Sequence, residues 1–179
     1  MIIYLIGFMG SGKTYMGKIL SQHMNVLHVD LDEWIVESSG KTIASIFETE
    51  GEEKFRKKET NALAEIKEKF DQQEASMISA VVSCGGGAPC FNGNMEWMNS
   101  NGITVWLNPP IETLLLRLEN EKMHRPLIAN LSGQEMKSFI EHKLQERALF
   151  YSQAKLMVTE QEIDITLLIK NINHASHIQ

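Results

Sequence analysis

Residues 7–14 read Gly7-Phe8-Met9-Gly10-Ser11-Gly12-Lys13-Thr14, which satisfies the phosphate-loop pattern G-x-x-x-x-G-K-[ST]. In such a loop the glycines let consecutive backbone N–H groups point at phosphate oxygens. The Lys13 side chain would reach the β- and γ-phosphates of a nucleoside triphosphate, and the Thr14 hydroxyl would bind magnesium. An accidental match has odds of roughly 1% in a chain of this length. The expected nucleotide-binding residues here are Gly10, Ser11, Gly12, Lys13, Thr14 and Tyr15.

Short apolar runs alternate with amphipathic stretches along the chain. Strands are predicted at residues 2–6, 26–29, 77–83, 103–107 and 156–158. Helices are predicted at 13–23, around 33–36 with a stop at Gly40, and at 50–70, 111–119, 132–151 and 163–172. Strands that alternate with helices form parallel sheets covered on both faces. The sequence therefore predicts an α/β fold with three layers, αβα, and a central five-stranded parallel sheet.

The connections between these elements carry further expectations. Thr42 is a candidate cap for a short helix, residues 121–131 read as a loop, and the tail beyond Asn173 is expected to fray. The length of 179 residues fits one domain, 1–179, better than two. In parallel sheets ligands bind at the carboxyl ends of the strands, so the chemistry should follow Ile6, Val29, Ser83 and Leu107, and unusual residues do follow the first three.

The composition excludes several classes of partner. With a formal net charge of −6 the protein has no overall attraction to nucleic acid or to an anionic membrane. No apolar run reaches the ~18 residues of a membrane helix, and no signal peptide is recognised. The two cysteines, Cys84 and Cys90, give neither a disulfide framework nor a zinc pattern. We expect a cytoplasmic protein that concentrates positive charge at one site.

Two acids follow the second predicted strand. Asp30 and Asp32 are two residues apart, so their side chains would point the same way if the strand geometry persisted. Asp30 could hold magnesium, directly or through water, and Asp32 could accept the proton of a substrate hydroxyl. The alternative is that an aspartate here only caps the following helix.

A glycine triplet follows the third predicted strand. Gly85, Gly86 and Gly87 would leave backbone N–H groups bare and allow a ligand to approach closely, unless they form only a loose loop. Ser83, just before them, could hold a magnesium-bound water.

Four arginines are candidates for binding anions. Arg56, Arg117 and Arg147 lie on predicted helices, where each taken alone would be a surface residue. Arg125 precedes Pro126 in the polar segment, and such a loop can close over phosphates and supply charge to the transition state.

These motifs, in this order, resemble the shikimate kinases, which belong to the nucleoside-monophosphate-kinase-like phosphate-loop enzymes. The similarity runs from Ile2 to about Val158. It includes the phosphate loop, the D-x-D of Asp30 and Asp32, and the glycine triplet. It also includes the segment from Ile46-Phe47 through Gly51-Glu52 to Phe55-Arg56 and Glu59, the sequence Arg125-Pro126-Leu127, and Arg147 with Tyr151. Two positions depart from the family pattern, since Cys84 replaces a threonine or aliphatic residue and Pro89 follows the triplet.

The resemblance implies a phosphate-loop kinase with strand order 2-3-1-4-5 and a mobile lid at about 119–131. It implies magnesium- and ATP-dependent phosphorylation of the 3-hydroxyl of shikimate, in the pathway to chorismate and the aromatic amino acids.

The resemblance also implies the site residues, and the substrate-binding segment would span about 32–60. Substrate-binding residues would be Asp32, Arg56, Gly85, Gly86, Gly87 and Arg147; nucleotide-binding residues would include Arg117 and Arg125. The catalytic residues would be Asp32, Lys13 and Arg125, and the metal would be held by Thr14, with Asp30 and Ser83 acting through water. The partners would be ATP and shikimate, without nucleic acid or membrane, and a monomer is expected.

Three other functions are compatible with a phosphate loop. A kinase of gluconate or of a nucleoside monophosphate shares the loop and the sheet, but is not expected to carry this series of motifs. A GTPase-type switch needs D-x-x-G and N-K-x-D motifs, which the sequence lacks. An inactive nucleotide-binding homologue is disfavoured by the presence of Lys13, Asp32 and Arg125.

Overall fold

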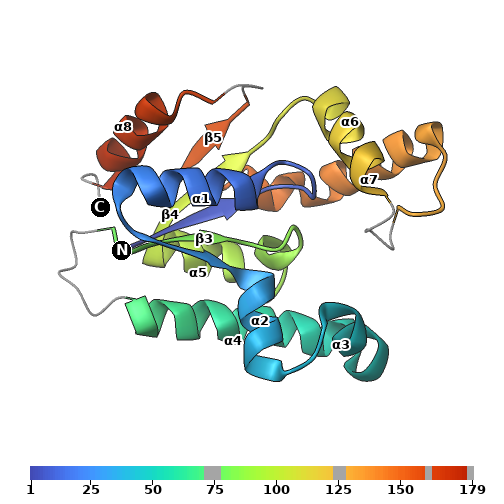
Figure 1. Ribbon diagram of the computed structural model, residues 1–179, viewed down its shortest axis with the longest axis horizontal. Helices are drawn as coiled ribbons and strands as arrows, with labels where there is room; N and C mark the ends of the chain where they lie inside the picture. Colours follow the sequence, from blue (N-terminus) through green and yellow to red (C-terminus); the bar gives the residue numbers. More distant parts are fainter. Residues whose placement is uncertain (71–77, 123–127, 160–162, 177–179) are drawn as a thin grey trace.

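The computed structural model describes residues 1–70, 78–122, 128–159 and 163–176. They form helices packed on both sides of a single sheet (Figure 1). Within these ranges no helix is both long and apolar enough to span a membrane.

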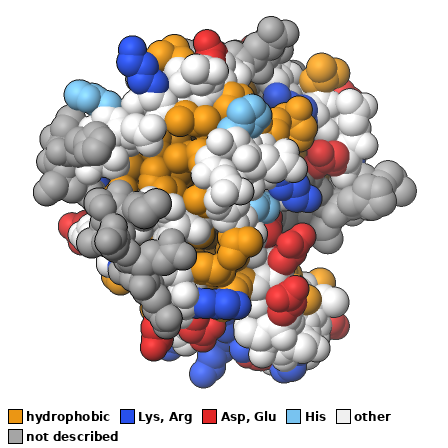
Figure 2. Space-filling view, turned by 60° about the vertical axis from the view of Figure 1, so that its left-hand side comes forward, with side chains coloured by type: hydrophobic (Ala, Val, Ile, Leu, Met, Phe, Trp, Pro, Cys, Tyr) orange, Lys and Arg blue, Asp and Glu red, His pale blue; other side chains and the backbone are white. Residues whose placement is uncertain are grey.

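The sheet has five parallel strands in the order β2-β3-β1-β4-β5, which confirms the expected fold and strand order. The strands are β1 (Ile2–Ile6), β2 (Leu27–Asp30), β3 (Ala80–Ser83), β4 (Gly102–Leu107) and β5 (Leu156–Val158). In this register Leu5 of β1 pairs with Ser83 on one side and Val105 on the other. The segments that follow β1, β2 and β3 therefore emerge at one edge of the sheet. Figure 2 looks toward the opposite side, where hydrophobic side chains reach the surface among charged ones.

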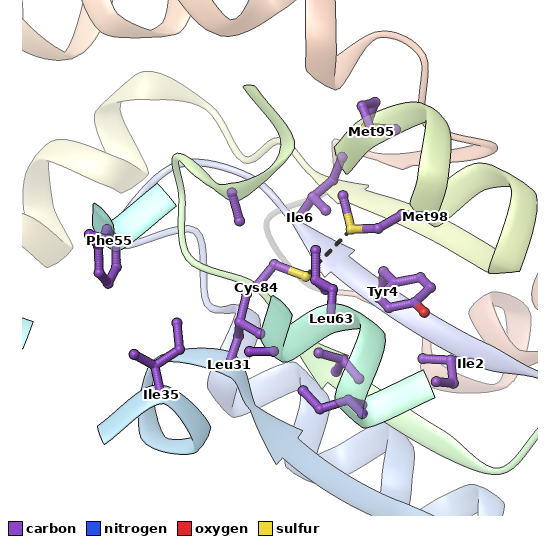
Figure 3. Packing of buried hydrophobic residues seen from close by; sticks show 14 of the residues in the cluster. Ile2, Tyr4, Ile6, Leu31, Ile35, Phe55, Leu63, Cys84, Met95 and Met98 are labelled. Carbon is purple, nitrogen blue, oxygen red and sulfur yellow. Dashed lines mark hydrogen bonds between the residues drawn. The ribbon is translucent and has the colours of Figure 1, made fainter. Parts of the chain in front are cut away.

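The alternation of side chains along β1 builds a core on each face of the sheet. The eight helices of the described residues are α1 (Lys13–Met24), α2 (Leu31–Ser39), α3 (Ile43–Glu50), α4 (Glu52–Phe70), α5 (Asn94–Asn101), α6 (Ile111–Glu121), α7 (Gly133–Tyr151) and α8 (Ile165–Ser176). Ile3 and Leu5 pack in one core with residues of α1 and α8. Ile2, Tyr4 and Ile6 pack in the other with residues of α2, α4 and α5, as Figure 3 shows. There the Cys84 thiol lies 3.8 Å from the Met98 sulfur, so this unusual cysteine serves as a buried apolar residue.

Local capping explains where several helices begin and end. Thr42 caps α3 as expected by accepting a hydrogen bond from the Ser45 N–H. Gly40 ends α2 in a left-handed conformation. Ser132 and Glu135 form a reciprocal capping box at the start of α7, which fixes the helix start that the sequence predicts.

Several sequence-based boundaries are wrong. The strand geometry does not persist beyond Asp30, because that aspartate caps α2 and the helix begins at Leu31. Helix α5 and a short 3-10 turn at Ala88–Cys90 were not predicted. Helix α8 continues to Ser176, so the chain just beyond Asn173 is helical where fraying was expected. The expected lid and the third strand extend partly into residues 123–127 and 71–77, which lie outside the described ranges.

Candidate functional site

The phosphate loop lies between β1 and α1, as the motif requires. Gly12 precedes the helix with a φ of +94°, a left-handed conformation that favours glycine. No side chain of the described residues caps the start of α1. Its first backbone N–H groups are therefore available to bind an anion, and the positive end of the helix dipole adds to that attraction.

Polar side chains of the loop gather at the same place. Lys13 Nζ donates hydrogen bonds to the carbonyl oxygens of Gly7 and Phe8, at 3.0 and 2.9 Å, so the ammonium group lies over the loop. The Ser11 hydroxyl is buried and has no hydrogen-bond partner among the described residues. A buried hydroxyl of this kind is usually satisfied by a ligand or water.

Asp30 combines the two roles that the sequence left as alternatives. One carboxylate oxygen accepts hydrogen bonds from the N–H groups of Asp32 and Glu33 and so caps α2. The other accepts a hydrogen bond from the Thr14 hydroxyl at 2.9 Å. The cap therefore fixes a carboxylate against the expected magnesium ligand of the phosphate loop.

Asp32 lies in the first turn of α2 and faces the glycine triplet. Its Oδ1 atom is buried without a hydrogen-bond partner among the described residues. A Cβ atom on Gly85 would lie 3.1 Å from that oxygen. Burial, and then the charge of Asp30, raise the pKa of Asp32, while Lys13 and Arg56 lower it. Asp32 thus has a raised pKa and one oxygen that no described residue hydrogen-bonds, which suits it to accept a proton.

Arg56 projects from α4 and is held by two carboxylates. Its Nε and Nη2 atoms donate to Glu52 Oε1 at 3.1 and 2.8 Å, and Nη1 donates to Glu59 Oε2 at 2.8 Å. A Cβ atom on Gly87 would lie only 2.6 Å from Nη1, so the guanidinium group approaches the chain as closely as glycine allows.

Glu59 belongs to the sequence motif described above, but it was not among the site residues predicted from the sequence. It is 1% exposed and lies in the apolar stripe of α4 with Phe55, Ala62 and Leu63. Burial raises its pKa to about 7, although the ion pair with Arg56 opposes that shift. A glutamate in the buried stripe of an otherwise charged helix was the signal that could have identified it.

Arg147 reaches the same triplet from α7. Its Nη1 atom donates to the Gly86 carbonyl at 3.1 Å, and the Tyr151 hydroxyl donates to the same oxygen. The guanidinium carbon lies 5.5 Å from the centroid of the Phe8 ring. Two arginines far apart in the sequence therefore converge beside Gly86 and Gly87.

One cavity of about 1110 Å³ connects these groups. It is lined by the triplet, Asp32, Arg56, Glu59 and Arg147. Residues 9–14 of the phosphate loop and Asp30 line it too, as do Tyr15, Arg117, Ile163 and Ile165. Arg117 also donates to the Gly10 carbonyl at 3.2 Å. The arrangement can hold a phosphorylated donor and a small anionic acceptor side by side.

One expected residue is absent from the described lining of this cavity, and another lies outside the described residues. Ser83 is absent from its described lining, and the Ser83 hydroxyl donates to the Lys13 carbonyl at 3.0 Å and bonds His28 Nε2 at 2.9 Å. The structure thus gives Ser83 a contact that supports the start of α1, and its role at magnesium stays a prediction. Arg125 lies outside the described residues, so its expected place over the phosphates also stays a prediction.

Comparison with known proteins gives a consistent picture. The family model described as shikimate kinase matches residues 9–174. A shikimate kinase of Azobacteroides pseudotrichonymphae is 44% identical over 170 residues, which cover 95% of this chain and 96% of the relative. The crystal structure of shikimate kinase from Bacteroides thetaiotaomicron has a TM-score of 0.81 at 37% identity and covers 99% of this chain and 97% of its own. The structure of shikimate kinase from Acinetobacter baumannii in complex with shikimate has a TM-score of 0.76 at 33% identity and covers 96% of this chain and 89% of its own.

The burial of Glu59 predicts a pH dependence of stability. Its pKa of about 7 lies above the ordinary value of 4.5, so the folded chain binds this proton more tightly than the unfolded chain. The free energy of unfolding should therefore fall as the pH rises from 4.5 through 7, by about 3 kcal/mol from this group alone. Measured by urea unfolding across that pH range, the free energy of unfolding should decrease less for Glu59→Gln than for the wild type. The exposed Glu53→Gln on the same helix should behave as the wild type, and equal slopes in all three proteins would contradict this prediction.

Proposed function

The chain belongs to the shikimate kinase family, and from this premise we propose that it transfers the γ-phosphate of ATP to the 3-hydroxyl of shikimate. The observation that carries the proposal is the convergence of Arg56, Arg147 and Asp32 on the glycine triplet, in the cavity that also contains the phosphate loop. Two guanidinium groups and one carboxylate match an acceptor with a carboxylate and hydroxyls. The A. baumannii relative, which was solved in complex with shikimate, supports the choice of acceptor.

The donor half of the site fits ATP with magnesium. Gly10 to Thr14 would hold the phosphates with backbone N–H groups, and Tyr15 and Arg117 would lie against the rest of the nucleotide. The Thr14 hydroxyl, the expected direct ligand, lies 2.9 Å from the Asp30 carboxylate, and magnesium prefers such an oxygen-rich site. When bound there, magnesium would neutralise charge on the β- and γ-phosphates. Ser83 and Asp30 would contribute through water.

The acceptor half supplies orientation and a base. Arg56 and Arg147 would bind the carboxylate of shikimate, with the backbone of Gly85, Gly86 and Gly87 close to the ring. Asp32 would accept the proton of the reacting hydroxyl as its oxygen bonds to the γ-phosphorus. The bond from phosphorus to the bridging oxygen breaks, and ADP leaves. Lys13 and Arg125 would neutralise the charge that develops on the transferred group.

The state of the protein in the cell is part of the same proposal. Each residue assigned above comes from one chain, so we propose a single-domain monomer. Cys84 and Cys90 are free thiols, which favours a reducing compartment such as the cytoplasm.

A coupled assay of ADP release tests the choice of acceptor. With ATP and magnesium, shikimate should give a kcat/KM at least about 100-fold above that of gluconate or AMP. The rigid ring of shikimate fixes its carboxylate and its hydroxyl relative to each other, whereas gluconate is a flexible chain and AMP has no carboxylate. Turnover with gluconate or AMP but not with shikimate would refute the proposal.

Replacing Asp32 tests the base. Asp32→Asn keeps the shape of the side chain but cannot accept the proton, so kcat should fall about 100-fold or more. Glu33→Gln, which neutralises the neighbouring exposed acid in the same helical turn, should retain nearly full activity. Full turnover of Asp32→Asn would show that the assigned role is wrong.

A further inference from the structure

The segment that follows the glycine triplet places an aromatic ring beside the site without lining it. Phe91 is 39% exposed and is absent from the described lining of the cavity. Its ring centroid lies 4.3 Å from the guanidinium carbon of Arg56. At that distance a guanidinium group gains a favourable interaction with the face of a ring. A partly exposed phenylalanine is therefore kept against the residue assigned to the substrate carboxylate.

The backbone beside Phe91 is shaped to hold this contact. Asn92 adopts a φ of +53°, a left-handed conformation that is uncommon for residues other than glycine. Its Nδ2 atom donates to the Arg56 carbonyl at 3.2 Å and to the Thr60 hydroxyl at 3.0 Å. The residue next to the ring is thus tied to the same turn of α4 that carries Arg56.

Asn94 anchors the other end of the segment. It is 1% exposed, and its Oδ1 atom lies 3.0 Å from the Thr60 hydroxyl. Its Nδ2 atom donates to the Ala88 carbonyl at 2.9 Å. Buried side-chain hydrogen bonds of this kind resist displacement, because breaking one leaves a polar group unsatisfied. The loop from Phe91 to Asn94 is consequently a fixed support for α4 near Arg56.

The hydrogen bonds of Arg56 leave a specific edge for a ligand. A guanidinium group has five N–H donors. The bonds to Glu52 use one on Nε and one on Nη2, and the bond to Glu59 uses one on Nη1. Each terminal nitrogen therefore keeps one N–H that these two glutamates do not use, and such groups can donate to the carboxylate of a ligand.

The ring and the carboxylates restrain Arg56 in different directions. Hydrogen bonds to Glu52 and Glu59 hold the edges of the guanidinium group but tolerate some tilt of its plane. The Phe91 ring, whose centroid lies 4.3 Å from the guanidinium carbon, limits that tilt by direct contact. Because a bidentate carboxylate must lie nearly in the guanidinium plane, the tilt of that plane decides how well the acceptor is held.

We propose that Phe91 is a positioning residue, whose ring fixes the plane of the Arg56 guanidinium group so that its two remaining N–H groups receive the acceptor's carboxylate. This inference rests on the proposed function, since it takes shikimate as the acceptor. Phe91 acts through Arg56, because Phe91 itself is absent from the described lining of the cavity.

Substitutions of Phe91 distinguish the interaction between the ring face and Arg56 from the packing of an apolar side chain at this position. Phe91→Leu keeps an apolar side chain but removes the π face, so the Kd for shikimate measured by calorimetry should rise about 3- to 10-fold. Phe91→Tyr should bind as the wild type does. Phe70→Leu is the matched control, because the Phe70 ring also lies near a cation, Lys69 Nζ at 5.5 Å, outside the described lining of the cavity. The KM for ATP should be unchanged in all three variants.

A change in the ligand distinguishes positioning of Arg56 from a general structural effect. The carboxamide of shikimate cannot form the charged bidentate pair, so Phe91→Leu should change its Kd by less than about twofold. Equal loss of affinity for shikimate and its carboxamide, or no loss for shikimate, would overturn the proposal. If Phe91→Leu does not fold, Phe91→Met replaces it, and its Kd values for shikimate and the carboxamide are compared in the same way. Failure of the wild type to bind and phosphorylate shikimate would instead refute the proposed function.

Discussion

Three consecutive residues without side chains, Gly85 to Gly87, are the constraint on which the site depends. A Cβ atom on any of them would meet a polar or charged group, namely the carboxylates of Glu59 and Asp32 at Gly85, Arg147 at Gly86, and Arg56 at Gly87. The triplet leaves β3 at the carboxyl edge of the sheet, where α2, α4 and α7 each supply one or more of these side chains. Because the triplet has no side chains, charged groups from three helices can meet in the space beside it.

The convergence explains how a protein of net charge −6 can bind an anion. The positive groups are few, but Arg56 and Arg147 adjoin neighbouring residues of the triplet, and Lys13 lies over the phosphate loop of the same cavity. Glu52 and Glu59 each pair with Arg56 and orient it while leaving one N–H on each terminal nitrogen. The net charge of the chain affects anion binding less than these contacts do, because salt screens exposed charges that lie more than a Debye length from the bound anion.

The sequence predicted the sheet, its order and the main segments that line the cavity, because those rest on local patterns. The strand runs are continuous and apolar, and the phosphate loop is a contiguous motif. Helix α5 was missed because its asparagines have poor helix propensity, and it owes its stability to burial of Met95 and Met98 against the sheet. The contact of Phe91 with Arg56 joins segments that are distant in the sequence, so only the fold could reveal it.

Substitution of Gly87 tests the role of the triplet most directly. Its φ of −91° is open to alanine, so Gly87→Ala adds only a methyl group, which would lie 2.6 Å from Arg56 Nη1. The account predicts that the Kd for shikimate, measured by calorimetry, rises about tenfold or more while the KM for ATP is unchanged. Gly133→Ala, which meets nothing within 4 Å, is the matched control and should bind as the wild type does. Unchanged shikimate affinity in a folded Gly87→Ala protein would contradict the account.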